Sequence, residues 1–328
     1  MADRRRALIV VSLLATAACA QATGETETTS CAEAFAATLS IPIPDQPPAD
    51  HVAYSSDIVL LDQNLQPGRR LTDDGRSGYP DFSPDGERIA FESFRGYEPA
   101  GDFDVGLSSI WVIGQDGQGE EQLTRGYGDR FPRWSPDGER IVFLRWDGDS
   151  YQPQILDVDG GTTTALDAPV YDRLDWISDD VLAGVSYDEQ NYTTYLFQVD
   201  VATGDVQRIE SGVDDVGGGV LWSPDGTEFA YVRQPPREPY DRAARPTIQI
   251  HDLETGEERT VPGSDTLVNQ LILWTSDGSL LFWQNTRGAG YNIALSADGG
   301  QATERVIGAH RDGQAVSDPY SDNPVCAP

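Results

Sequence analysis

The side chains that could carry out chemistry are few and scattered in this 328-residue chain. The three histidines, His51, His251 and His310, lie far apart and lack the His-x-x-x-His spacing of a helical metal site. The chain contains no Gly-x-Ser-x-Gly sequence, which presents the nucleophile of α/β-hydrolases. We therefore expect each histidine to be structural or exposed, and the protein to be non-catalytic.

Two Asp-rich segments invite comparison with calcium loops. In Asp147-Gly148-Asp149-Ser150 and Asp157-Val158-Asp159-Gly160, carboxylates occupy alternate positions, but neither segment continues to the distal glutamate of a full loop. The same residue types favour tight hairpin turns, because Asp bonds the local backbone and Gly tolerates positive φ. The sequence therefore predicts no cofactor, with calcium as the alternative.

The N-terminus has the pattern of an export signal over residues 1–18. Arg4, Arg5 and Arg6 precede an apolar run, residues 7–15, that is too short to span a bilayer. Residues 14–19 resemble a bacterial lipobox, with Thr16 where Leu is usual, so Cys19 is a candidate for lipidation. Cleavage before Gln21 is the alternative. Residues 19–50, rich in Thr, Ala, Glu and Pro, are interpreted as a tether and lead-in.

Cysteine usage agrees with export. If Cys19 is lipidated or removed, Cys31 and Cys326 are left as an even pair in an oxidising compartment. We predict a disulfide between them that joins the two ends of the folded domain; two free thiols are the alternative.

The charge excludes one class of partner. The chain has 23 basic residues, all arginine, against 54 acidic residues, and a formal net charge of -31. Nucleic-acid binding needs a basic surface, so we expect no nucleic-acid partner. A solvated acidic surface is the simplest interpretation of the charge.

A repeat organises the chain after His51. Residues 81–91 (DFSPDGERIAF), 133–143 (RWSPDGERIVF) and 221–231 (LWSPDGTEFAY) are clear copies, and 175–180 and 273–278 are degraded ones. Equivalent positions recur at steps of 42 to 52 residues, the period of a β-propeller blade.

Each repeat predicts four strands separated by polar turns. Pro-Asp-Gly is a turn sequence, and the flanking runs are rich in aromatic and β-branched residues. The four strands of a repeat are here called A, B, C and D in chain order. The first repeat lacks strand A, with strands B, C and D expected at 51–54, 57–61 and 70–72, whereas 318–323 reads as a strand A with nothing after it. The sequence thus predicts an all-β, six-bladed β-propeller over 51–328, closed by the C-terminal strand A joining the N-terminal strands B, C and D.

The Leu-Thr, Trp-Ser-Pro-Asp-Gly and Ile-Ala-Phe elements resemble the repeats of the TolB-type propeller family, also called WD40-like or PD40 repeats. The resemblance covers roughly residues 51–323 and implies the fold more than a function. Propellers of this type occur in periplasmic protein-binding subunits, in the N-terminal half of prolyl oligopeptidase-like enzymes and in some lyases. TolB itself has a separate α/β domain before its propeller, and the lead-in of this chain is too short for one.

The loops between strands B and C and between strands D and A lie on one face of a propeller, called here the long-loop face. In this chain they are long and carry aromatic and arginine side chains, the residue types that dominate interface hot spots. The candidate partner-binding residues are Phe94, Arg95, Tyr97, Tyr127, Arg130, Trp146, Tyr171, Arg173, Tyr187, Arg233, Tyr240, Arg242, Arg287 and Arg311.

These features predict a monomeric, exported propeller that binds a protein or peptide of the cell envelope and touches the membrane only through a lipid anchor. It would lie at the outer face of the cytoplasmic membrane, in the periplasm or at the cell surface. Two alternatives stay open. One is an enzyme with a polar or metal site at the channel mouth, acting on a saccharide or peptide; the other is a sensor domain for a small molecule or calcium.

Overall fold

The Ser-Pro-Asp-Gly motifs form tight turns that join strands A and B in the computed structural model. The Ser83 hydroxyl donates to Asp85 Oδ1 at 2.5 Å and accepts the Arg88 N–H at 2.9 Å, while Gly86 adopts a φ of 70°. The same bonds recur in the two other clear copies, around Ser135 and Ser223. The motif aspartates are therefore turn residues, because their side chains hold the hairpin.

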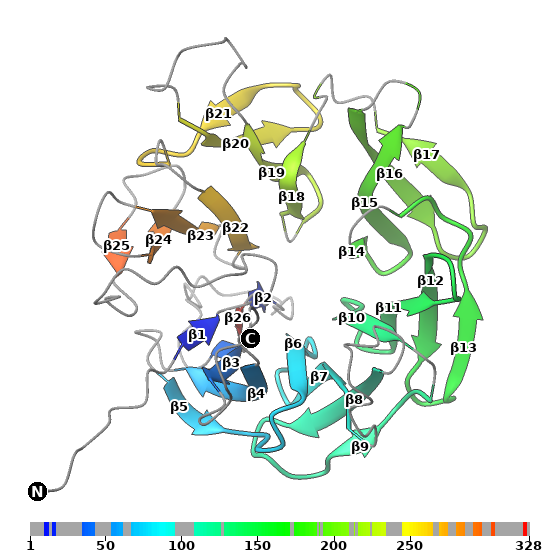
Figure 1. The fold of residues 1–328 in the computed structure, drawn as a ribbon. Coiled ribbons are helices and arrows are strands. Elements are labelled where there is room, and N and C mark those ends of the chain that lie inside the picture. Colours follow the sequence, from blue (N-terminus) through cyan, green and yellow to red (C-terminus); the bar gives the residue numbers. More distant parts are fainter. Residues whose placement is uncertain are drawn as a thin grey trace, which may run out of the picture.

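The structure describes residues 54–61, 67–95, 108–125, 128–170, 174–188, 190, 193–209, 213, 216–223, 225–233 and 245–264, and elsewhere only short strands. Its architecture is an all-β propeller of antiparallel sheets set around a common centre (Figure 1). Each four-stranded sheet follows the chain from its innermost strand to its outermost strand, as the repeat predicts. The four sheets that contain most of the described side chains are β6 (Ser77–Phe82), β7 (Arg88–Ser93), β8 (Ser109–Gly114) and β9 (Glu121–Gln122); β10 (Asp129–Trp134), β11 (Arg140–Trp146), β12 (Tyr151–Asp157) and β13 (Thr162–Ala165); β14 (Leu174–Ser178), β15 (Val181–Asp188), β16 (Thr193–Asp200) and β17 (Val206–Arg208); and β18 (Gly217–Trp222), β19 (Glu228–Arg233), β20 (Thr247–Asp252) and β21 (Glu258–Thr260).

Strands nearer the two ends of the chain form two further sheets. A further four-stranded sheet has the order β22 (Asn269–Trp274), β23 (Leu280–Asn285), β24 (Tyr291–Ser296) and β25 (Thr303–Arg305). The remaining sheet has the order β2 (Ala15–Ala17), β26 (Pro324–Cys326), β3 (Phe35–Pro42), β4 (Tyr54–Leu61) and β5 (Pro67–Arg70), and β1 (Val10–Ser12) pairs with β3.

This last sheet differs from the sequence prediction in three places. The strand paired with β4 on its inner side is β3, which lies at 35–42 within the expected lead-in and not at 51–54. The alternation of apolar and small residues in β3 suits a strand, but the Thr- and Ala-rich composition around it obscured that signal. The outer strand β5 precedes the expected 70–72, and the C-terminal strand is β26 at 324–326 and not 318–323.

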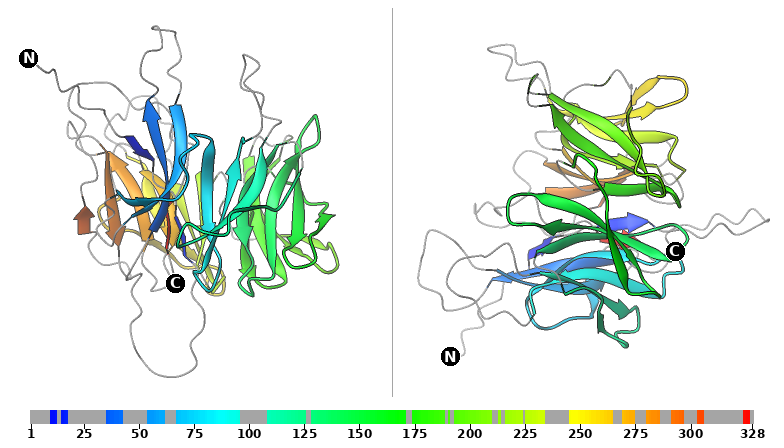
Figure 2. Two further views of the ribbon diagram at one scale, coloured as in Figure 1. Left: turned by 90° about the horizontal axis from the view of Figure 1, so that it is seen from below. Right: turned by 90° about the vertical axis from the view of Figure 1, so that its right-hand side faces the viewer.

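The hydrophobic core lies between neighbouring sheets, which pack face to face around the ring (Figure 2). Ala90, Ile110 and Val112 of one sheet pack against Trp134 and Phe143 of the next. Outer strands β9, β13, β17 and β21 are short and exposed, as expected for the protected edges of propeller blades. Among the described residues, no helix is long and apolar enough to cross a membrane.

Candidate functional site

The described candidate residues share one face of the ring. Phe94 and Arg95 follow the end of β7, Trp146 ends β11 and Arg233 ends β19, while Arg130 lies at the start of β10. In an antiparallel sheet, the end of strand B and the start of strand A lie at the same edge, so these residues belong to the long-loop face. Tyr187, near the end of β15, lies there as well. Outside the described residues are Tyr97, Tyr127, Tyr171, Arg173, Tyr240, Arg242, Arg287 and Arg311, together with Cys19 and Cys31.

Carboxylates hold two of the described arginines of this face in place. Arg95 pairs with Asp74 and, at 2.5 Å, with Glu120, and its guanidinium lies 5.1 Å from the centre of the Trp111 ring. Arg233 binds Glu258 at 2.6 Å, and because Glu258 begins β21 at the opposite end of the sheet, the Arg233 side chain extends back along the sheet. Carboxylates therefore orient both arginines and largely balance their charges.

A cluster around Arg130 stands out on this face. Tyr79 of β6 and Phe131 of β10 both occupy β-bulges, and both have a left-handed backbone, with φ of 52° and 57°. Their rings meet edge to face at 4.6 Å, and the Arg130 guanidinium lies over both, 5.4 Å and 4.8 Å from their centres. A bulky residue in this region costs about 1–3 kcal/mol, and such strain concentrates at ligand clamps and active sites.

The buried carboxylate of Glu92 holds the Arg130 cluster in place. Glu92 of β7, only 2% exposed, accepts from Arg130 Nε at 3.3 Å and from the Phe131 N–H at 3.4 Å. Burial raises the pKa of Glu92, although the Arg130 charge and hydrogen bonds partly offset this effect. In the next sheet, Asp129, which precedes Arg130 on β10, is fully buried and binds Arg145 through two hydrogen bonds of 2.6 and 2.8 Å. Glu92 thus holds Arg130 and the Phe131 backbone, and the neighbouring Asp129–Arg145 ion pair fixes the start of β10.

A second charged cluster joins three inner strands. Arg133 of β10 lies between Asp81 of β6, at 3.6 Å, and Asp175 of β14, at 3.2 Å. The Trp134 N–H donates to Asp81 Oδ2 at 2.6 Å. Burial raises the pKa of Asp81 to about 7, because desolvation outweighs the opposing effects of Arg133 and the Trp134 hydrogen bond. This Asp81–Arg133–Asp175 cluster links the innermost strands of three successive sheets, near the centre of the ring.

The sequence pointed to Arg130, but not to Tyr79, to Phe131 or to the Asp81–Arg133–Asp175 cluster. The residue before the aromatic residue near the end of strand A is Asp81, Arg133 and Asp175 in three successive repeats, and this alternation of charge was the available signal. Tyr79-Pro80 and Phe131-Pro132 likewise repeat an aromatic-proline pair at the same position.

The Asp-rich turns have backbone partners of their own. Asp147 accepts from the backbone N–H groups of Asp149 and Ser150 at 2.8 and 2.9 Å, and Asp157 accepts from Gly160 at 2.7 Å. Among the described residues, no group of three or more His, Cys, Asp or Glu side chains could hold a metal ion.

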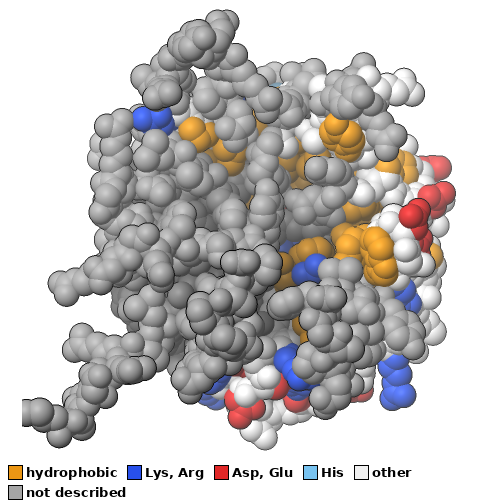
Figure 3. Space-filling model, in the orientation of Figure 1, with side chains coloured by type: hydrophobic (Ala, Val, Ile, Leu, Met, Phe, Trp, Pro, Cys, Tyr) orange, Lys and Arg blue, Asp and Glu red, His pale blue; other side chains and the backbone are white. Residues whose placement is uncertain are grey.

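In the described part of the face seen in Figure 3, hydrophobic side chains gather towards the middle of the ring, acidic ones lie at its edge, and basic ones occur in both places. This distribution places apolar contact surface near the centre and solvating charge on the rim.

Comparison with known proteins supports this architecture. No family model matches the chain. An uncharacterised protein of Agrobacterium fabrum is 32% identical over 192 residues, which cover 56% of this chain and 48% of that protein. The chain therefore spans about half the length of this curated relative.

Among solved structures, TolB from Acinetobacter baumannii superposes with a TM-score of 0.63 at 16% identity, over 90% of this chain and 67% of TolB. The fold is that of a TolB-like β-propeller. An acylaminoacyl peptidase from Pyrococcus horikoshii superposes with a TM-score of 0.59 at 16% identity, over 92% of this chain and 46% of the peptidase. At these identities the likeness concerns the fold alone, and the same TolB-like β-propeller occurs both in TolB and in a peptidase.

Proposed function

We propose that this chain is an exported, non-catalytic propeller that binds a protein or peptide partner through its long-loop face. The observation that carries the proposal is the Arg130 cluster, in which two aromatic residues with left-handed backbones surround an arginine that is held by the buried carboxylate of Glu92. Tyr, Phe and Arg are enriched at interface cores, and a rigid cluster loses little entropy on binding.

The propeller is proposed to have six blades in a closed ring. β26 pairs with β3 through Val325 and Cys326, and β22 lies against β2 and β26. β1 and β2 fall within the expected export signal. If this signal is cleaved, β1 and β2 are lost and the order β26-β3-β4-β5 is left, a four-stranded sheet like the other five.

Export and lipid anchoring are proposed from the N-terminal pattern, with Cys19 as the lipidated residue. Radiolabelled palmitate should label the wild-type protein and not Cys19→Ala when both are expressed in a bacterial host. Equal labelling of the two proteins would refute lipidation of Cys19. Cleavage of the export signal before Gln21 would then be the remaining interpretation.

The binding proposal is tested by crosslinking capture from the native envelope. We expect Arg130→Glu and Phe131→Ala to lose a crosslinked partner that the wild type captures, because both residues belong to the Arg130 cluster. Arg259→Glu is the control: Arg259 is exposed and also paired with a carboxylate, Glu228, but at the opposite end of the sheet. Retention of the same partner by both cluster variants would refute the proposed face.

An enzyme with a polar site at the channel mouth is the second candidate, and the Asp81–Arg133–Asp175 cluster favours it. An Asp with a pKa near 7 can exchange a proton at neutral pH, as a general acid or base does. Hydrolysis or elimination of a saccharide or peptide substrate that Asp81→Asn abolishes, in a variant that still folds, would favour this function over binding alone.

A further inference from the structure

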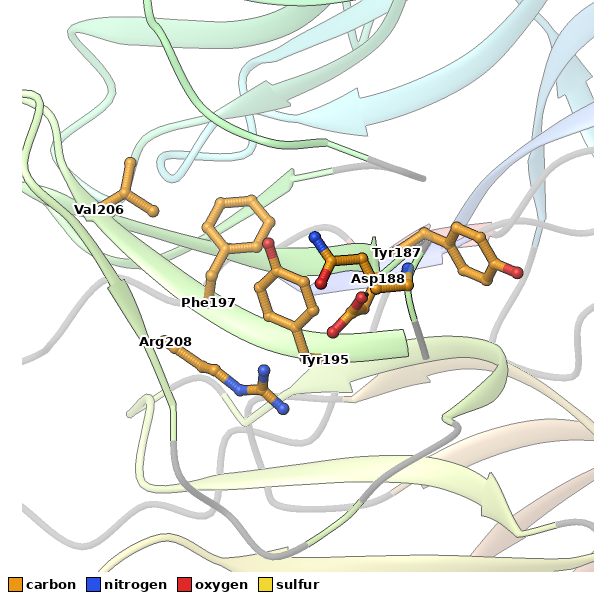
Figure 4. Close-up of a pocket in the computed structure, with 7 residues that line it drawn as sticks. Tyr187, Asp188, Tyr195, Phe197, Val206 and Arg208 are labelled. Atoms are coloured by element: carbon orange, nitrogen blue, oxygen red, sulfur yellow. Dashed lines mark hydrogen bonds between the residues drawn. The ribbon is translucent and has the colours of Figure 1, made fainter. Parts of the chain in front are cut away.

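The outer part of the β14–β17 sheet holds a pocket of about 450 Å³, within the range of small-molecule sites. It opens on the face of the sheet that packs towards the preceding sheet, where Phe197 joins a core with Val142 and Leu166. Figure 4 shows the side chains that shape it: Asp188, Tyr195, Phe197, Val206 and Arg208, together with Gln190. We call this the blade-4 pocket.

Strand register explains how these side chains meet. Tyr195 and Phe197 are two residues apart on β16 and point to the same face, and Arg208 of β17 pairs directly with Phe197. The Arg208 guanidinium lies over the Tyr195 ring at 4.7 Å from its centre. Asp188 is oriented by the Gln190 N–H, which donates to its Oδ1 at 2.9 Å.

Tyr187 borders the pocket but belongs to the other side of the sheet. It precedes Asp188 on β15, so their side chains alternate, and Figure 4 shows the Tyr187 ring directed away from Tyr195 and Phe197. Tyr187 and Val206 are the exposed large hydrophobic side chains of the described part of the chain, at 37% and 40% exposure. Both of them lie at this one pocket.

A glycine leaves room for the Phe197 ring. Gly184 pairs with Phe197 across the sheet, and a Cβ at Gly184 would lie 3.1 Å from the Phe197 ring and 2.7 Å from Leu174. The equivalent pair in the preceding sheet is Phe143 and Gln154. The phenylalanine of this pair is thus on strand B in the preceding sheet and on strand C in the β14–β17 sheet, where it lies beside the other pocket residues.

The preceding sheet serves as an internal comparison. Its equivalent pocket contains Gln152, Gln154 and Ala165 at the positions of Tyr195, Phe197 and Arg208. The Asp at the end of strand B is common to both, as Asp147 and Asp188. At these three positions one sheet thus carries an aromatic–guanidinium pair and the other carries neutral residues, although Arg145 and Asp167 also line the second pocket.

We propose that the blade-4 pocket binds a short saccharide. Without Tyr187, four of the six side chains that shape the pocket carry hydrogen-bonding groups, and the opposite charges of Asp188 and Arg208 demand no net charge of the ligand. Planar carboxylate, amide and guanidinium groups can form hydrogen bonds with adjacent hydroxyls of a sugar ring. The side chains of Tyr195 and Val206 can pack against the C–H groups of the same ring. An apolar peptide side chain would instead favour a predominantly apolar lining. This site is separate from the Arg130 cluster, so it does not depend on the proposed partner binding.

Saturation-transfer NMR on the folded full chain provides the test. The probes are maltose, cellobiose, N,N′-diacetylchitobiose and a glucuronate-containing disaccharide, with the tripeptide Ala-Glu-Ala as the rival ligand. We expect at least one saccharide to bind the wild type and to bind Arg208→Gln and Tyr195→Ala at least tenfold more weakly. Gln152→Ala, at the equivalent position of the preceding sheet, should bind like the wild type.

Three results would overturn the proposal: no saccharide signal with the wild type, signals that are equal in Arg208→Gln and Gln152→Ala, or binding of the tripeptide alone. Arg208 is exposed, so Arg208→Gln should fold even if Tyr195→Ala does not. Arg208→Gln should also still capture the partner of the long-loop face, which separates a failure of this site from a failure of the proposed function.

Discussion

Asp81→Asn replaces a carboxyl group that is 3% exposed and lies between β6 and β10. Burial raises the pKa of Asp81 from 3.8 to about 7, so between these pH values the folded protein holds a proton that the unfolded chain has released. The free energy of unfolding therefore falls as the pH rises through this window. A shift of this size corresponds to about 4 kcal/mol in total, at about 1.4 kcal/mol for each pH unit.

Urea unfolding at pH 5, 6, 7 and 8 measures this effect. We expect the wild type to lose stability across the series and Asp81→Asn to lose much less, so that the difference between the two proteins changes with pH. Glu92 also has a raised pKa, but it is present in both proteins and its contribution cancels in the difference. If the difference between the two proteins is constant from pH 5 to pH 8, the assignment of a proton to Asp81 is wrong.

Three further perturbations test other parts of the structure. Tyr79→Gly should be more stable than Tyr79→Ala by about 1 kcal/mol in thermal unfolding, because glycine adopts the observed φ of 52° without a Cβ penalty; equal stabilities would argue against backbone strain. Gly184→Ala should destabilise the protein by about 1–3 kcal/mol, since its Cβ would overlap Leu174; a neutral result in urea unfolding would contradict the close packing of Leu174 and Phe197 over Gly184. Non-reducing peptide mass spectrometry should find Cys31 linked to Cys326, because Cys326 pairs in register with Phe35, close in sequence to Cys31; free thiols at both positions would exclude the disulfide.

Much of the architecture was predictable because it depends on local chemistry. The turn motif around Ser83 and Asp85 forms bonds within a few residues, so its copies mark the hairpins. The strand C expected at 57–61 lies within β4. Strand β3 was not predicted because the Thr- and Ala-rich composition around it obscures its alternation of apolar and small residues.

The candidate site was predicted only in part. Arg130, Arg95 and Arg233 were placed on the long-loop face from loop position alone, and the structure adds that each has a carboxylate partner. Tyr79 was not considered, because a left-handed backbone at a non-glycine residue has no clear sequence signal.

The sequence by itself determined the turns, the strand periodicity, the acidic surface and the repeat, because each of these follows from neighbouring residues. Only the tertiary structure brought Asp81, Arg133 and Asp175 together, or stacked Arg130 on Tyr79 and Phe131. These contacts cross from one sheet to the next, and their geometry depends on how the sheets pack around the ring. The sequence shows that strand A contains charged and aromatic residues. The packing of the sheets decides whether each of these side chains faces the core, the central channel or the neighbouring sheet.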